Sequence, residues 1–317
     1  MCAMRSRTRS FSHVHLTSEG GVALSLPAAL QVAPHLRARR GAAITRAQMT
    51  IIDHEFSDIA TPSGPMRTHL FRPAAPGKYP AISLFSEIFQ VTGPIRRTAA
   101  MLAGHGFLIA APEIFHEYEP AGTVIGYDSA GADRGNWCKQ EKSLAAYDAD
   151  LAAIREFLKT HPNSTGRLGS MGICIGGHLN FRNCFSPDIR AGVCFYATDI
   201  HKIESHKRGI GANMADDTLE RARRGDIKGE MLMVWGRQDP HVPFEGRMQI
   251  RRALEEGGIN HQTFEVNGAH AFLRDEGPRY NPTLARQCYG LAIELFQRRL
   301  GEGDLAADAA GAGETRH

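Results

Sequence analysis

The sequence predicts an α/β domain with a doubly wound, mostly parallel sheet and helices on both faces. Short apolar runs alternate with longer segments of helical periodicity, and most of the runs lack polar alternation. Such runs are typical of strands covered on both faces. Because strands and helices alternate, reactive groups are expected at the carboxyl ends of the strands. The chain has 317 residues, of which 42% are hydrophobic and 22% charged, so it can bury one large core.

The expected elements follow from these runs and their spacing. Residues 198–228 are predicted to form an irregular excursion over the sheet, and no internal repeat is evident. The predicted strands are 81–86, 106–112, 166–174, 191–197, 230–236 and 261–267. The predicted helices are 93–105, 138–160, 176–185, 244–257 and 281–300.

The two ends of the chain are expected to lie outside the folded domain, which we predict at residues 49–300. Residues 1–48 contain seven arginines and one acidic residue, the composition of an organelle transit peptide. The alternative is that Met49 is the true start and the leader is translated noise or a flexible tail. Residues 301–317 lack large apolar side chains beyond Leu305, and we expect disorder there.

Composition narrows the compartment and the partners. No apolar run reaches the roughly 18 residues of a membrane-spanning helix. The net charge of +3 comes from the leader, so a nucleic-acid partner is not expected. We expect a cytoplasmic monomer, or an organelle protein if the leader is a transit peptide. The cysteines show neither metal-ligand spacing nor a disulfide framework, and no metal or cofactor is expected; they are Cys2, Cys138, Cys174, Cys184, Cys194 and Cys288.

Residues 166–181, GRLGSMGICIGGHLNF, pass from a predicted strand through a glycine-rich turn into a predicted helix. Gly172, Cys174 and Gly176 form G-x-C-x-G, the cysteine counterpart of the G-x-S-x-G nucleophile elbow. Side chains two residues before and after the nucleophile would crowd this turn, so glycine is needed there. The helix N-terminus favours a thiolate and a nearby oxyanion. The alternative is a small buried structural cysteine.

A base and an acid follow in the chain order expected of this elbow. Asp239 comes directly after the strand at 230–236, and His270 directly after the strand at 261–267. Each has an alternative, because Asp239 could stabilise a turn and His270 is one of 15 histidines. His241 and His178 are poorer candidates for the base, since neither lies in the final post-strand loop.

These residues, together with SEIFQV at 86–91, resemble the dienelactone hydrolase (carboxymethylenebutenolidase) family over about residues 50–300. The resemblance implies an α/β-hydrolase fold. It also implies that Glu87 lies beside the thiol and helps to activate it, and that the backbone N–H groups of Ile88 and Ile175 form the oxyanion hole. A carboxylate at the end of a buried strand needs a partner, and Glu87 could instead cap a helix or pair with Arg96 or Arg97.

The resemblance further implies arginines that bind a substrate carboxylate. Arg274 matches the family position after the histidine, and its alternative is a surface pair with Asp275 or Glu276. The second family position falls at Ala132, where this chain departs from the pattern; Arg134, two residues away, is the displaced candidate.

The chemistry of a thiol nucleophile limits the substrate. Thiolate leaves more easily than alkoxide, so a tetrahedral intermediate on Cys174 reverts unless the substrate has a still better leaving group. Enol lactones and activated esters meet this condition. We expect a cysteine-dependent hydrolase that opens such small molecules through a thioester. A general carboxylesterase or thioesterase on the same fold, and a non-catalytic binding protein, remain alternatives.

Overall fold

The computed structural model describes residues 50–202, 209–211 and 216–301 of the chain. The predicted leader, and the predicted tail beyond residue 301, lie outside the described residues.

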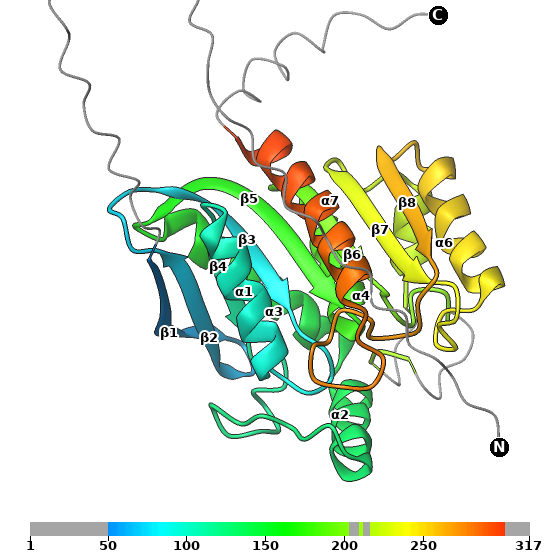
Figure 1. The fold of residues 1–317 in the computed structure, drawn as a ribbon, viewed down its shortest axis with the longest axis horizontal. Coiled ribbons are helices and arrows are strands. Elements are labelled where there is room, and N and C mark those ends of the chain that lie inside the picture. Colours follow the sequence, from blue (N-terminus) through cyan, green and yellow to red (C-terminus); the bar gives the residue numbers. More distant parts are fainter. Residues whose placement is uncertain (1–49, 203–208, 212–215, 302–317) are drawn as a thin grey trace, which may run out of the picture. The chain divides into compact units, whose positions relative to one another are not determined.

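One mixed sheet of eight strands forms the centre of the described domain, in the order β1-β2-β4-β3-β5-β6-β7-β8 (Figure 1). β2 pairs antiparallel with β1 and with β4, and all other neighbouring strands are parallel. The predicted doubly wound, mostly parallel sheet is therefore confirmed. The strands are β1 (Ile51–Thr61), β2 (Gly64–Pro73), β3 (Tyr79–Phe85), β4 (Leu108–Pro112), β5 (Ser164–Ile173), β6 (Ile189–Phe195), β7 (Glu230–Gly236) and β8 (His261–Val266).

Helices cover both faces of this sheet. Figure 1 shows α1 and α7 in front of the strands and α3 and α4 behind them. The helix α4 begins directly after the central strand β5 and packs against β5 and β6, so its N-terminus lies at the carboxyl edge of the sheet. The helices are α1 (Gly93–Gly104), α2 (Ser129–Glu141), α3 (Leu144–Thr160), α4 (Ile175–Asn183), α5 (Thr218–Arg223), α6 (Phe244–Glu256) and α7 (Pro282–Leu300).

Three features differ from the sequence prediction. The helix predicted at 138–160 is wrong as one element, because Lys142 is extended and the Ser143 side chain caps α3 by accepting from the Ala146 amide. The hairpin of β1 and β2 was not predicted, since most of β1 is partly or fully exposed and carries no apolar run. The excursion at 198–228 contains the short helix α5.

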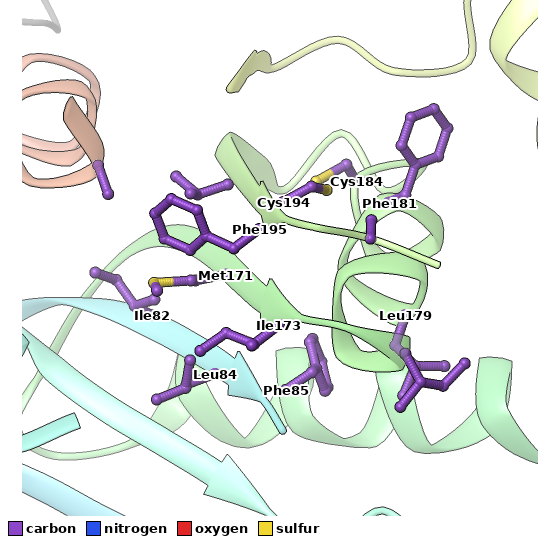
Figure 2. Packing of buried hydrophobic residues seen from close by; sticks show 14 of the residues in the cluster. Ile82, Leu84, Phe85, Met171, Ile173, Leu179, Phe181, Cys184, Cys194 and Phe195 are labelled. Atoms are coloured by element: carbon purple, nitrogen blue, oxygen red, sulfur yellow. The ribbon is translucent and has the colours of Figure 1, made fainter. Parts of the chain in front are cut away.

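The core lies between the sheet and its helices, and it fixes the carboxyl ends of β3, β5 and β6. Figure 2 shows side chains from these three strands packing with side chains of α4. Burial of each large apolar side chain of this kind stabilises the fold by about 1.5 to 3 kcal/mol. The central strands therefore present their carboxyl ends on a rigid base. The labelled residues are Ile82, Leu84, Phe85, Met171, Ile173, Leu179, Phe181, Cys184, Cys194 and Phe195.

Within the described part of the chain, none of the helices is both long and apolar enough to span a lipid bilayer.

Candidate active site

Cys174 occupies the turn between β5 and α4, with φ 61° and ψ −121°. A non-glycine residue in this region costs about 1 to 3 kcal/mol of backbone strain. Backbone hydrogen bonds hold the turn: the Cys174 amide donates to the Phe195 carbonyl at 3.0 Å, and the Thr198 amide donates to the Cys174 carbonyl at 3.2 Å. The strained residue is thus tied to the end of β6.

The two elbow glycines lie where no side chain fits. A Cβ atom on Gly172 would meet the backbone carbonyl of Gly176, and one on Gly176 would meet the carbonyls of Phe85 and Ser86. α4 therefore lies directly against the end of β3. This close approach brings the β3 loop next to the cysteine.

The predicted base and acid lie beside the cysteine. His270 Nε2 is 3.3 Å from Cys174 Sγ, and His270 Nδ1 is 2.7 Å from Asp239 Oδ2. Asp239 Oδ1 accepts from the His241 amide at 2.8 Å, so both carboxylate oxygens are bonded. His270 and Asp239 are both buried. The structure thus brings together the three groups that were predicted from separate loops.

The charges around His270 favour a protonated imidazole. Burial lowers the pKa of His270, but Cys174 and the carboxylate of Asp239 outweigh it and raise the pKa to about 10. The ordinary value is about 6.5. The imidazole that faces the sulfur therefore carries a positive charge at neutral pH.

The amides predicted for an oxyanion hole are available. Ile175 is the first residue of α4, where an N–H group has no partner within the helix. Ile88 lies in the turn after β3, and its amide donates no hydrogen bond in the described part of the chain. Ile88 and Cys174 line the same cavity. Neither amide is therefore used by a hydrogen bond among the described residues, although Ile175 itself is not among the residues that line the cavity.

Glu87 is buried at the end of β3 and lies 3.7 Å from Arg274 Nη1. Burial raises the pKa of Glu87, and the charge of Arg274 opposes this only in part. The alternative partners proposed for Glu87 are engaged elsewhere: Arg96 donates to the Asp53 carbonyl, and Arg97 binds the carboxylates of Asp275 and Glu276.

Arg274 is positioned by aromatic rings. Its guanidinium lies 4.3 Å from the ring centre of Tyr127 and 5.5 Å from that of Phe89. Its Nε atom is buried and has no hydrogen-bond partner among the described residues. The alternative of a surface pair with Asp275 or Glu276 does not apply, because Arg97 binds both carboxylates.

A cavity of about 710 Å³ opens over these groups. It is large enough for a small-molecule substrate, and its walls combine apolar and charged side chains. The lining residues named in the prediction are Glu87, Ile88, Cys174, His270 and Arg274.

Arg134 does not line this cavity. Its Nε donates to Glu119 at 2.5 Å, and its guanidinium lies 4.5 Å from the ring centre of Trp137. The prediction of Arg134 as a substrate contact disagrees with this position. It came from counting along the chain, and counting could not show that an acid and an indole ring hold the side chain outside the cavity.

The cavity also contains polar groups that the sequence did not reveal. Lys139 projects from α2, while Asp199 and Lys202 follow β6 and Arg279 follows β8. His241, described above as a poorer candidate for the base, lies edge-on to His270 with ring centres 4.6 Å apart. The adjacency of Asp239 to His241 in the chain was the one available signal.

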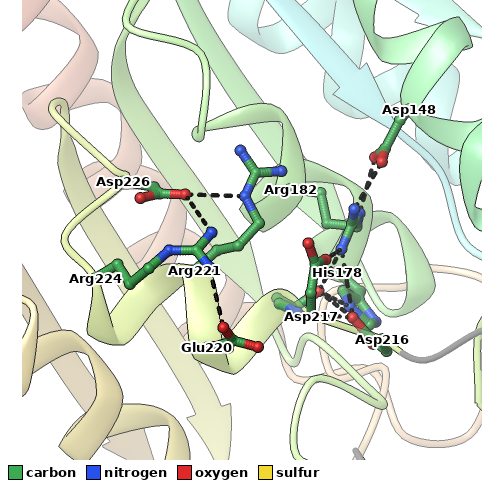
Figure 3. A network of polar contacts seen from close by, with 10 residues as sticks. Asp148, His178, Arg182, Asp216, Asp217, Glu220, Arg221, Arg224 and Asp226 are labelled. Carbon is green, nitrogen blue, oxygen red and sulfur yellow. Dashed lines mark hydrogen bonds and ion pairs between the residues drawn. The ribbon is translucent and has the colours of Figure 1, made fainter.

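A polar network anchors α4 on the side that faces α3 and α5 (Figure 3). Arg182 is buried and binds Asp148 at 2.7 Å and Asp217 at 2.7 Å. His178 Nε2 lies 3.0 Å from the Thr218 hydroxyl. These contacts join α4 to α3 and to the start of α5, so the helix that follows the cysteine is fixed at both ends.

One group in the described part of the chain has metal-ligand spacing, namely His116, Glu117 and Asp150. The ammonium of Lys142 lies among them, 2.5 Å from an oxygen of Glu117 and 2.5 Å from one of Asp150. Because the lysine already supplies a positive charge, we interpret the group as an ion-pair network.

Comparison with known proteins identifies the family. Residues 66–300 match the dienelactone hydrolase family. A Saccharomyces cerevisiae protein with the provisional name carboxymethylenebutenolidase is 36% identical over 261 residues, covering 79% of this chain and 93% of that protein. A Pseudomonas carboxymethylenebutenolidase is 25% identical over 236 residues, covering 74% of this chain and 91% of its own.

A solved structure supports the fold. A Klebsiella pneumoniae protein with the provisional name dienelactone hydrolase superposes with a TM-score of 0.67 at 22% identity, covering 78% of this chain and 99% of its own. The predicted α/β-hydrolase fold is therefore confirmed. From the matched sequence, the strand order and this likeness together, the chain belongs to the dienelactone hydrolase family and is a hydrolase acting on ester bonds.

Proposed function

We propose that this protein is a cysteine-dependent hydrolase that opens enol lactones or activated esters through a thioester on Cys174. The observation that carries the proposal is the line from Cys174 Sγ to His270 Nε2 at 3.3 Å and from His270 Nδ1 to Asp239 at 2.7 Å. Nucleophile, base and orienting acid are linked in this order in acyl-transfer enzymes on unrelated folds.

In the first half of the cycle, Cys174 Sγ attacks the carbonyl carbon and the carbonyl oxygen becomes an oxyanion. The amides of Ile88 and Ile175 stabilise that charge. Loss of one such donor in comparable sites lowers the rate by roughly 10²- to 10³-fold. Collapse of the intermediate breaks the bond to the ring oxygen, which leaves as an enolate and takes up the proton of the His270 imidazolium.

The raised pKa of His270 suits the second half. The negative charge of Cys174 is a main cause of this high value, and acylation of the sulfur removes that charge. The pKa of His270 then falls, and the imidazole can accept a proton from the water that attacks the thioester. Asp239 holds the Nδ1–H tautomer throughout. The same histidine thereby serves as cation first and as base afterwards.

Glu87 is proposed to assist proton transfer at the thiol. Because burial raises the pKa of Glu87 toward neutral pH, its carboxyl group can accept and return a proton. The contact with Arg274 at 3.7 Å keeps it in place without a bidentate bond. A carboxylate-bearing substrate could therefore compete with Glu87 for the guanidinium.

The kinetic test compares Cys174→Ala and Cys174→Ser with wild type on enol lactones and p-nitrophenyl esters. We expect no turnover for the alanine variant and little for the serine variant, because the surrounding groups suit a thiol. Full activity of the serine variant would contradict the thiol mechanism. Turnover of neutral alkyl esters at rates equal to enol lactones would favour the alternative of a general carboxylesterase.

A further inference from the structure

The cavity has a second charged end, which the proposed chemistry does not use. Asp199 is buried, and its carboxylate binds Lys139 Nζ at 2.8 Å through one oxygen and Lys202 Nζ at 2.7 Å through the other. All three residues line the cavity. Two lysine ammonium groups thus bind the same carboxylate at this end of the cavity.

Asp199 is held in an unusual conformation to make these contacts. Its φ is 68°, in the left-handed region that favours glycine. Burial opposes its ionisation, but the two lysines outweigh this and keep the pKa of the carboxyl below its ordinary value. Strain held by a buried ion pair at a cavity wall is typical of functional sites. The ion pairs with the two lysines thus offset the backbone strain at Asp199.

The strand order separates this end from Arg274. Glu87 and its partner Arg274 lie at the end of β3, Cys174 lies at the end of β5, and Asp199 follows β6. Since the order is β3-β5-β6, the two cationic groups flank the cysteine on opposite sides. Neighbouring strands are about 4.8 Å apart, so the ends of β3 and β6 are separated by about 10 Å.

Lys202 and His241 can both donate to a ligand at this end. The side chain of Lys202 is 26% exposed, and one of its three N–H groups is used by Asp199. The His241 ring lines the same cavity. Its backbone amide donates to Asp239, whereas its two ring nitrogens have no hydrogen-bond partner among the described residues. The other two N–H groups of Lys202 stay available to an anion.

We propose that Lys202 and His241, supported by Lys139, form a second anion-binding subsite across Cys174 from Arg274. The preferred substrate then carries two acidic groups, one on each side of the scissile carbonyl. This inference rests on the proposed function for the position of the carbonyl, but binding of a dianion does not depend on turnover. Adipate, a dicarboxylate that spans several carbons, is a suitable probe, and hexanoate is its monoanionic match.

Isothermal titration calorimetry at constant ionic strength tests the subsite directly. A charged hydrogen bond contributes enough for wild type to bind adipate about tenfold more tightly than hexanoate. In Lys202→Met the ratio of the two dissociation constants falls to about one, whereas Lys202→Arg keeps the preference. Lys78, an exposed lysine on the approach to β3, gives the matched control Lys78→Met, which keeps the wild-type ratio.

The proposal is overturned if wild type binds the two acids equally, or if Lys202→Met retains the preference for adipate. Failure of the proposed function has a different signature, namely ester turnover that survives in Cys174→Ala. The two results are independent, because calorimetry reports binding without any chemical step.

Discussion

Gly176→Ala is expected to damage activity far more than stability. In the elbow, a Cβ atom at this position would lie 2.5 Å from the Ser86 carbonyl oxygen and would also meet the Phe85 carbonyl. An ordinary C···O contact is about 3.3 Å, so the start of α4 must move by about 1 Å. This movement carries the Ile175 amide and Cys174 with it.

The two effects on stability largely cancel. Alanine favours a helix over glycine by about 1 kcal/mol, whereas overpacking against rigid backbone costs about 1 to 3 kcal/mol. A displacement of 1 Å at a reacting centre can cost about 10²-fold in rate. We therefore expect kcat/KM for a p-nitrophenyl ester to fall about 100-fold, while Tm changes by only a few degrees.

Gly290→Ala is the matched control. Gly290 lies in α7, where an added Cβ meets no atom within 4 Å. It should raise the free energy of unfolding by about 0.5 to 1 kcal/mol and leave kcat/KM unchanged. The reasoning is refuted if Gly176→Ala retains wild-type kcat/KM, or if Gly290→Ala loses as much activity as Gly176→Ala.

The remaining predictions concern charges. Arg274→Ala should raise KM for a carboxylate-bearing ester about 10- to 100-fold and spare a neutral ester; equal losses on both would exclude a role in anion binding. Arg182→Met should lower the free energy of unfolding by about 1 to 3 kcal/mol in urea titrations, because it removes the buried guanidinium that binds Asp148, Asp216 and Asp217; a loss below about 0.5 kcal/mol would contradict this. Since the pKa of His270 is raised from 6.5 to about 10, its stabilising contribution is complete below pH 6.5 and is lost as the pH rises toward 10. Wild type should therefore lose its stability advantage over Cys174→Ala across this window, and a growing advantage would reverse the assigned sign.

Local sequence patterns predicted much of the fold and the three candidate residues Cys174, His270 and Asp239. The predicted strand 230–236 corresponds to β7, and Asp239 in the loop after it contacts His270 as predicted. This was predictable because a buried strand and its terminal loop are contiguous in the chain. Glycine spacing around Cys174 likewise reflects a contact between residues close in sequence.

Contacts between distant segments left no such signal. Lys139 and Asp199 are 60 positions apart, and neither stands out in its own segment. Arg134 was misplaced for the same reason, since Glu119 and Trp137 hold it outside the cavity. The break at Lys142 was missed although Ser143 is a capping residue; the buried contact of Lys142 with Asp150 that accompanies the break left no signal in the sequence.

Intact and peptide mass spectrometry of the acyl-enzyme tests the thioester most directly. His270→Gln slows deacylation and should accumulate the intermediate when it is mixed with a p-nitrophenyl ester. The proposed mechanism predicts one added acyl group, located on the peptide that contains Cys174 and released by hydroxylamine. An acyl group on any other residue, or steady turnover with no adduct at Cys174, would contradict it.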